Sequence, residues 1–273
     1  MIGRSIGFGF STARDFIARG LIRLGVAPNT LTLTGMALTA LAGVAYAAGA
    51  GNTLTWRENL LPPSLRGTAH ANPYLLLAGA LLVLSSACDM LDGAVARLGN
   101  KKSRFGAFLD STLDRYSDFA VYAGIAVYYA WNSPANVTFI FLAMMAFLNG
   151  FMISYTRARA EDIIEKCTVG YWQRGERSAA ILIATFAQNI PSLVVQQACL
   201  PLLTVMRRIF HTKAVIDGGT QITDPRQGGW WLKVRLWRWP RMTWPYDLVT
   251  GINIAWLIFA PVPAVDVIRK LVG

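Results

Sequence analysis

Residues 89–114 read DMLDGAVARLGNKKSRFGAFLDSTLD, and this stretch decides how the whole chain folds. It joins two long apolar runs through a short basic loop, and four carboxylates stand at the facing ends of the runs: Asp89, Asp92, Asp110 and Asp114. The first pair is three residues apart and the second pair four, so each pair shares one face of a helix. If the helices form an antiparallel hairpin, the two pairs meet, and the small residues beside them allow a close approach of the backbones. These small residues are Gly93, Ala96, Gly106 and Ala107.

Four carboxylates at one depth near the hydrocarbon boundary repel one another and cost several kcal/mol to desolvate unless cations compensate them. Their oxygen atoms suit Mg²⁺, Mn²⁺ or Ca²⁺ rather than zinc. Two divalent ions about 3.5 to 4 Å apart would neutralise the site and form a clamp for displacement at phosphorus. We therefore expect two Mg²⁺ ions, which Mn²⁺ can replace. The alternative is that the aspartates only form ion pairs with Arg97, Arg104 and Arg115.

The composition places this hairpin in a membrane. Of the 273 residues, 54% are hydrophobic and 15% charged, and the mean hydropathy is +0.39, which is too apolar for an ordinary soluble domain and excludes disorder. The net charge of +11 on such a chain favours anionic lipid head groups and phosphorylated substrates over nucleic acid. The three cysteines are too few and too scattered for a disulfide framework or a zinc site.

The apolar runs predict an all-α integral membrane protein with a six-helix transmembrane bundle. Its spans are expected at 31–50, 73–96, 107–131, 136–156, 173–190 and 192–209. The last two come from one apolar stretch, 178–206, divided at a turn over 188–192, because this division returns the basic segment that follows to the cytoplasm. One long tilted helix followed by an external loop is the alternative. An amphipathic interfacial helix is expected over 11–25.

Arginine and lysine set the orientation, because they gather on the cytoplasmic side. The N-terminus, the loop of 97–104 and the connection of 157–177 are basic, whereas residues 132–136 hold no Lys or Arg and 51–72 hold two. We therefore expect a multi-pass protein of the cell membrane with the aspartates at its cytoplasmic side.

The spaced pattern Asp89-x2-Asp92-Gly93-x2-Ala96-Arg97-x8-Gly106-x3-Asp110-x3-Asp114 resembles the signature of the CDP-alcohol phosphatidyltransferases. Members of this family are six-helix membrane enzymes, commonly homodimers, that displace CMP from a CDP-lipid with an alcohol. The resemblance implies that Asp89, Asp92 and Asp110 are metal ligands. It also implies that Asp114 is both a ligand and the base that takes the proton of the acceptor hydroxyl.

The same resemblance implies a set of contacts to the CDP-lipid. Gly93 is similar to the glycine against which the nucleotide lies, Arg97 to the arginine on the pyrophosphate, and Ser103 to a small hydroxyl residue of the loop. At the start of the first span, the motif after Pro28 contributes four more residues: Asn29, Thr30, Leu31 and Thr32. A plain helix cap explains that last motif equally well.

Two further strings are similar to the phosphatidylinositol-phosphate synthase branch and its archaeal counterparts, namely 154–161 (SYTRARAE) and 170–177 (GYWQRGER). The end of the sixth expected span, 206–211, resembles the same branch. This resemblance implies an acceptor-phosphate site made by Ser154, Arg157, Arg174, Arg177 and Arg208. Guanidinium groups bind phosphate in a bidentate way, so a phosphorylated polyol is expected as acceptor, with inositol phosphate first. Arg157 and Gln173 depart from the branch, which leaves glycerol 3-phosphate open.

We divide the chain into an amphipathic segment (1–27), a CDP-alcohol phosphatidyltransferase domain (28–211) and a C-terminal segment (212–273). Residues 228–244 alternate tryptophan with Lys and Arg, which favours an interfacial belt on anionic lipid over stacking with nucleic-acid bases. Whether 245–264 crosses the membrane is left open, as is the choice between a diacylglycerol and an archaeol donor. A transporter that uses intramembrane acids is the alternative of a different class.

Overall fold

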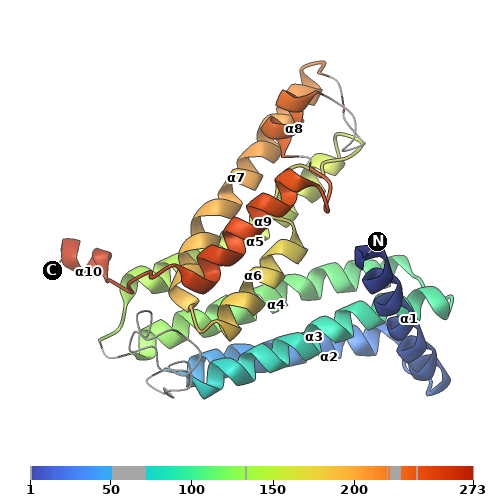
Figure 1. Cartoon of the computed structure of the whole chain (residues 1–273), viewed down its shortest axis with the longest axis horizontal. Helices are drawn as coiled ribbons and strands as arrows, with labels where there is room; N and C mark the ends of the chain where they lie inside the picture. Colours follow the sequence, from blue (N-terminus) through green and yellow to red (C-terminus); the bar gives the residue numbers. More distant parts are fainter. Residues whose placement is uncertain are drawn as a thin grey trace.

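The computed structural model describes residues 2–50, 72–132, 134–219, 221, 229–237 and 239–272, with side chains described between residues 11 and 271. This part of the chain is helical and contains no strand (Figure 1). The first four helices are α1 (Ile2–Arg23), α2 (Pro28–Ala48), α3 (Pro73–Leu98) and α4 (Arg104–Trp131). The remaining helices are α5 (Val137–Glu161), α6 (Arg174–Phe186), α7 (Ile190–Ile216), α8 (Trp230–Leu236), α9 (Trp244–Phe259) and α10 (Val267–Val272).

The division of the apolar stretch 178–206 into two helices is confirmed. α6 ends at Phe186 and α7 begins at Ile190, so the break comes slightly earlier than the expected turn. Gln188 adopts a positive φ of 58°, a conformation that ends a helix, and Pro191 follows in the first turn of α7. The last apolar run is shorter than expected: α9 ends at Phe259 because the following segment contains Pro261 and Pro263.

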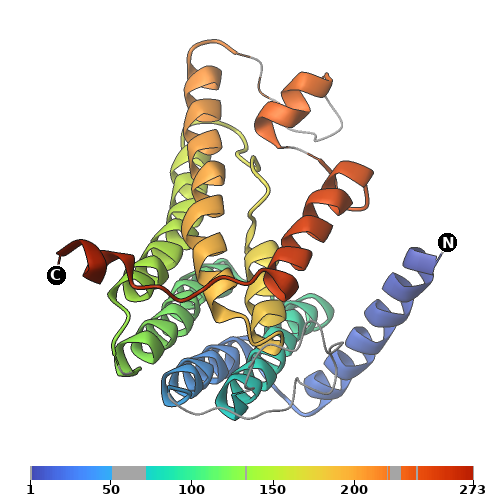
Figure 2. The same cartoon turned by 60° about the vertical axis from the view of Figure 1, so that its left-hand side comes forward.

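The helices form two groups. α2, α3 and α4 lie side by side, with α1 packed across α3, while α5 and α7 run together at a steep angle to them (Figures 1 and 2). α6 lies between the groups, against α3 on one side and α9 on the other. This arrangement brings the N-terminus of α6 over the halves of α3 and α4 that carry the aspartates.

The aspartates of α3 and α4 meet as expected, but the expected close approach of the two helix backbones is wrong. Both helices pack closely against α2 rather than against each other. The backbones approach most closely between α2 and α4, where a Cβ on Gly43 would meet the Ala120 carbonyl and one on Gly124 would meet the backbone of Gly43. The small residues expected at the contact between these helices line a cavity instead, because their small side chains leave this space open. These are Gly93, Ala96, Gly106 and Ala107.

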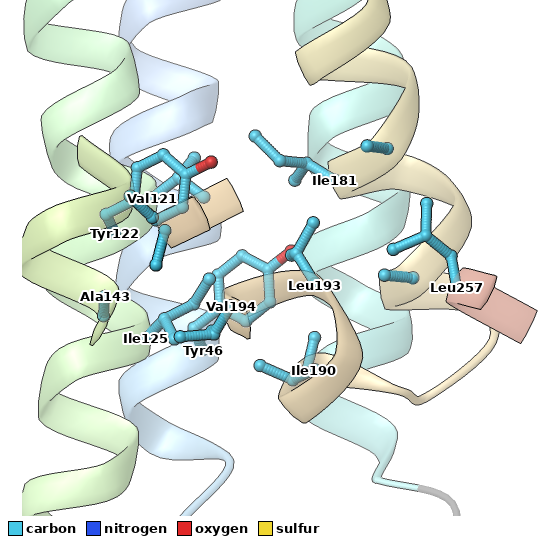
Figure 3. Packing of buried hydrophobic residues seen from close by; sticks show 14 of the residues in the cluster. Tyr46, Val121, Tyr122, Ile125, Ala143, Ile181, Ile190, Leu193, Val194 and Leu257 are labelled. Atoms are coloured by element: carbon cyan, nitrogen blue, oxygen red, sulfur yellow. The ribbon is translucent and has the colours of Figure 1, made fainter. Parts of the chain in front are cut away.

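The hydrophobic core lies where the helices from α2 to α7 meet (Figure 3). Tyr46, Ile125 and Leu193 are completely buried there. The Tyr46 hydroxyl forms a hydrogen bond with Thr185 of α6, so this polar group is satisfied inside the core. The core therefore fixes α6 relative to the helices that carry the aspartates.

Four helices of the described chain are long and apolar enough to cross a membrane: α2, α3, α5 and α7. α4 carries three aspartates and two arginines, which lower its hydropathy. α6 has 13 residues and is about 20 Å long at 1.5 Å per residue. The protein is therefore a multi-pass helical membrane protein.

The N-terminal helix is longer than expected, since α1 begins at Ile2 rather than near residue 11. The connection 51–72, expected to face outward, lies almost wholly outside the described residues, as do Gly228 and Arg238 of the tryptophan-rich segment. The C-terminal segment returns to the bundle. Asp266 accepts hydrogen bonds from the backbone N–H groups of Val137 (2.9 Å) and Thr138 (3.2 Å) at the start of α5.

Candidate active site

The carboxylates of α3 and α4 converge. One oxygen each from Asp89, Asp92 and Asp110 lie within 4.8 Å of one another. Thr32 of α2 donates a 2.7 Å hydrogen bond to Asp92, so three helices contribute to the cluster. Asp110 Oδ1 is buried and has no hydrogen-bond partner among the described residues. Such an orphaned carboxylate oxygen beside two further acids fits a divalent cation ligated by oxygen.

Asp114 joins the cluster through an arginine of α6. Arg174 Nη1 lies 3.0 Å from Asp89 and Nη2 lies 2.5 Å from Asp114, so one guanidinium bridges α3 and α4. Ion pairs of the aspartates with Arg97, Arg104 or Arg115 do not occur in the described structure. The alternative hypothesis, in which the aspartates only form ion pairs with these three arginines, is therefore wrong.

A cavity of about 290 Å³ opens beside Asp92 and Asp110. Its lining includes most of the residues expected to contact a CDP-lipid: Asn29, Thr32, Gly93, Arg97 and Ser103. The helix-cap explanation of the first motif is wrong, since α2 starts at Pro28 after Ala27 and no side chain caps it. Ser103 does cap α4, accepting a 2.9 Å hydrogen bond from the Gly106 N–H.

Two residues of that motif do not line the cavity. Thr30 is exposed, and Leu31 packs with Ala18, Ala94 and Val95 in a small apolar cluster between α1 and α3. The four residues of the motif are consecutive in a helix, so their side chains point in different directions. Only some of them can therefore face the same cavity.

A second cavity, of about 400 Å³, begins on the other side of the aspartates and extends between α2, α3, α4 and α6. Asp89, Asp114 and Arg174 line it, together with Asp118 and hydroxyl residues. Arg174 Nε is buried without a partner among the described residues. Arg177 does not line the cavity, but it lies one turn farther along α6 and its Nη1 is likewise buried without a partner in the described structure. Two buried, unpaired guanidinium donors fit an anion with several acceptor oxygens.

Asp118 is a member of this site that the sequence analysis missed. It lies four residues after Asp114 on the same face of α4 and accepts a 3.0 Å hydrogen bond from Arg177 Nη2. Arg177 is only 4% exposed, so Asp118 compensates a charge that is almost completely buried. The repeat at 110, 114 and 118 was the signal available in the sequence.

The other three residues expected at the acceptor phosphate, Arg157, Ser154 and Arg208, do not line the second cavity. Arg157 is partly exposed and pairs with Glu161 at 2.9 Å. Ser154 lines an apolar groove between α4 and α5 rather than either cavity beside the aspartates. Arg208 is buried, and its guanidinium donates to the Val169 carbonyl (3.1 Å), to Gln173 (2.9 Å) and to the Ile153 carbonyl. Arg208 therefore supports the loop before α6, and its role toward phosphate stays a prediction.

Residues 25–210 match the family model of CDP-alcohol phosphatidyltransferase, which covers more than half of the chain. The chain belongs to the CDP-alcohol phosphatidyltransferase family. The archaetidylinositol phosphate synthase of Pyrococcus horikoshii is 32% identical over 206 residues, 74% of this chain and 92% of that protein. The phosphatidylinositol phosphate synthase of Streptomyces avermitilis is 37% identical over 225 residues, 76% of this chain and 82% of that protein.

Solved structures of the family show the same fold. The crystal structure of the Mycobacterium tuberculosis phosphatidylinositol phosphate synthase with CDP-DAG bound superposes with a TM-score of 0.59 at 25% identity, covering 73% of this chain and 92% of that one. The same protein with manganese and citrate gives a TM-score of 0.60 at 24% identity, covering 79% and 96%. The enzyme class predicted from the aspartate spacing is confirmed.

Proposed function

We propose that this CDP-alcohol phosphatidyltransferase transfers the phosphatidyl-type group of a CDP-lipid to inositol phosphate and releases CMP. The observation that carries the proposal is the pair of cavities that meet at the aspartates. One is lined by the glycine, arginine and hydroxyl residues expected at a nucleotide. The other is lined by Arg174, whose Nε is unpaired, and Arg177 lies one turn farther along α6. Donor and acceptor sites on either side of one carboxylate cluster suit a direct displacement.

The acidic cluster would hold two divalent ions, Mg²⁺ or Mn²⁺, with Asp89, Asp92, Asp110 and Asp114 as ligands. Bound there, the ions supply charge neutralisation for the pyrophosphate and for the leaving CMP. Thr32 orients Asp92 through its hydroxyl, and Arg97 lies over Gly93, where it can contact the pyrophosphate. The contact of Arg174 with Asp89 and Asp114 keeps these two acids on the side of the second cavity.

Asp114 serves as the general base in this proposal. It lines the acceptor cavity and pairs with Arg174, which also contacts Asp89 of the cluster. An acceptor phosphate bound by Arg174 and Arg177 would bring its polyol hydroxyl toward Asp114, which takes the proton as the oxygen attacks phosphorus. One displacement then forms the new phosphodiester, so no phosphoenzyme is needed.

We expect the acceptor to carry its own phosphate because Arg174, which lines the second cavity, and Arg177, one turn farther along α6, each have a buried donor without a partner among the described residues. A neutral alcohol such as free inositol would leave the buried donors of Arg174 and Arg177 unpaired, which costs free energy. Relatives named phosphatidylinositol phosphate synthase and archaetidylinositol phosphate synthase support inositol phosphate. Glycerol 3-phosphate has the same charged group and is the second candidate.

We further propose six membrane spans, with α4 and α6 completing the four apolar ones, and an active site on the cytoplasmic side. The basic residues of α1, of the loop 97–104 and of the connection 157–177 support this orientation. The domain boundaries 1–27, 28–211 and 212–273 and a homodimer belong to the same proposal. The match of the family model to residues 25–210 supports the central domain.

The test is CMP release by the purified protein in detergent with Mg²⁺ and CDP-diacylglycerol. Inositol phosphate, glycerol 3-phosphate, free inositol, serine and choline are compared at equal concentrations. We expect acceptor-dependent CMP release with inositol phosphate and none with free inositol. A higher rate with glycerol 3-phosphate would correct the acceptor, and no acceptor-dependent release with any alcohol would refute the function.

A further inference from the structure

The side of α6 that faces away from the aspartates is bound by the segment that follows α7. Glu176 stands between Arg174 and Arg177, and a helix turns about 100° per residue, so its side chain points away from both arginines. Its Oε1 accepts hydrogen bonds from Arg241 Nε (3.1 Å), Arg241 Nη2 (2.8 Å) and the Tyr246 hydroxyl (2.6 Å). The Glu176 side chain is 7% exposed. A carboxylate this buried depends on its partners, since its own desolvation is costly.

Further contacts attach the same segment to the first turn of α6 and to the loop before it. A Cβ on Gly175 would lie 3.1 Å from Arg241 Nη2, so the guanidinium lies directly on the helix backbone. Tyr171 and Thr250 share a 3.0 Å hydrogen bond between their hydroxyls. Farther along α6, Leu257 of α9 is buried in the core (Figure 3). Both ends of α9 therefore contact α6 or its entry.

α6 needs such support because little within the helix fixes its start. It has 13 residues, and its N-cap residue, Gln173, makes no side-chain capping bond. Isolated helices of about this length are marginal in water. Its first turn nevertheless carries Arg174 and Arg177, whose guanidinium groups must meet Asp114 and Asp118 on α4. The position of that turn decides whether they do.

We propose that Arg241 and Tyr246 form a clamp on Glu176 that fixes the first turn of α6 and so positions Arg174 and Arg177 for the acceptor phosphate. This inference rests on the proposed function, because the acceptor site belongs to it. Glu176 is a positioning residue and touches neither substrate. The clamp comes from beyond residue 210, where the match to the family model ends. It thus gives the C-terminal segment a task in acceptor binding.

Steady-state kinetics test the coupling to the acceptor. With CDP-diacylglycerol saturating, Arg241→Ala should raise the KM for inositol phosphate about tenfold and leave the KM for CDP-diacylglycerol within about twofold. Tyr246→Phe removes one of the three hydrogen bonds and should have a smaller effect, and Arg241→Lys should recover part of the loss. Arg235→Ala is the matched control, because Arg235 is exposed on α8 in the same segment.

A double-mutant cycle tests whether the clamp acts through Glu176. Glu176→Gln should raise the acceptor KM on its own, and adding Arg241→Ala to it should cause little further change, because both substitutions remove the same contact. Two independent increases that multiply would overturn the assignment of Glu176 as the residue that is held.

Amide hydrogen exchange of residues 174–179, measured without substrate, separates this inference from the proposed function. Arg241→Ala should speed exchange there relative to wild type and to Arg235→Ala. If wild type uses no phosphorylated polyol, the proposed function fails, and with it the coupling to the acceptor, while faster exchange still supports the clamp. Unchanged exchange overturns the clamp, and faster exchange with an unchanged acceptor KM overturns its link to the acceptor.

Discussion

Among single residues, Asp114 has the largest number of proposed roles. It lies in the acceptor cavity, is a proposed metal ligand and is the proposed base. Asp114→Asn keeps the shape of the side chain but removes its charge and basicity. We expect kcat to fall by about 10³-fold or more, with an unfolding temperature near that of wild type. Asp162→Asn, at an exposed ion pair with Arg159, is the matched control and should be fully active. Full activity of Asp114→Asn would remove it as base.

The two cavities predict opposite kinetic effects for two arginines. Arg177→Ala removes a buried donor of the acceptor site, so we expect a higher acceptor KM and little change in the KM for CDP-diacylglycerol. Arg97→Ala lies at the nucleotide cavity and should do the reverse. Initial rates with each substrate varied in turn measure both constants. Equal effects of both variants on both constants would contradict separate sites.

The sequence predicts the residues of the site well where the chemistry requires a fixed spacing between them along the chain. The aspartates at 89, 92 and 110 converge as their helical periodicity indicates. Spacing does not predict which hydrogen-bond acceptor an arginine side chain binds. Arg208 is expected at phosphate, yet it bonds to the loop before α6, since a guanidinium can donate to backbone carbonyls as well as to phosphates. Asp118 continues the four-residue spacing of Asp110 and Asp114 but is not part of the family signature. Its pairing with Arg177 becomes visible only in the three-dimensional structure.

At the scale of elements, the contact between α2 and α4 depends on glycine. A Cβ on Gly124 would collide with the backbone of Gly43, and backbone cannot move aside as a side chain can. Gly124→Ala should therefore destabilise the protein by about 1 to 3 kcal/mol, measured by unfolding in a denaturing detergent. Gly251→Ala in α9 meets open space and should be neutral or stabilising by up to about 1 kcal/mol. Equal stability of the two variants would contradict the packing.

The contact of Asp266 with the start of α5 predicts a pH dependence of stability. Desolvation would raise the pKa of Asp266, but hydrogen bonds from the Thr138 hydroxyl and from the backbone N–H groups of Arg269 and Val137 outweigh it and lower the pKa to about 2. The unfolded chain has a pKa of about 3.9, so the stabilisation is present above about pH 4 and is lost as the pH falls toward 2. Asp266→Asn should lower the unfolding temperature at pH 7, and its difference from wild type should shrink near pH 3. A difference that does not vary with pH would refute this contact.

Apolar runs predict where the long helices lie, because burial in lipid requires both length and hydropathy. They predict the ends less well, since α7 continues to Ile216 whereas its span is expected to end at 209. The same reasoning misses α8 and α10, which have seven and six residues and no long apolar run. It also predicts the wrong neighbours for α3 and α4, since small residues indicate helix contact and ligand space alike. Only the three-dimensional arrangement separates the contact at Gly43 from the cavity at Gly93.

Across the whole molecule, the positively charged residues make contacts of different kinds. Arg174 and Arg177 face the carboxylates of α3 and α4, Arg97 faces the nucleotide cavity, and Arg241 binds Glu176 on the outer side of α6. The composition predicts a membrane protein with anionic partners. It does not predict that the C-terminal segment returns to α6, because that contact joins residues about 70 positions apart through single polar side chains.

We propose that the two cavities bind a CDP-lipid and a phosphorylated polyol, which react at the aspartates between them. The most direct measurement is the mass of the lipid product formed from CDP-diacylglycerol and inositol phosphate with Mg²⁺, together with the amount of CMP released. We predict phosphatidylinositol phosphate that retains the acceptor's phosphate, in a one-to-one ratio with CMP and absent after chelation of the metal. CMP release without a phosphorylated lipid product, or product formation that chelation does not affect, would contradict the account.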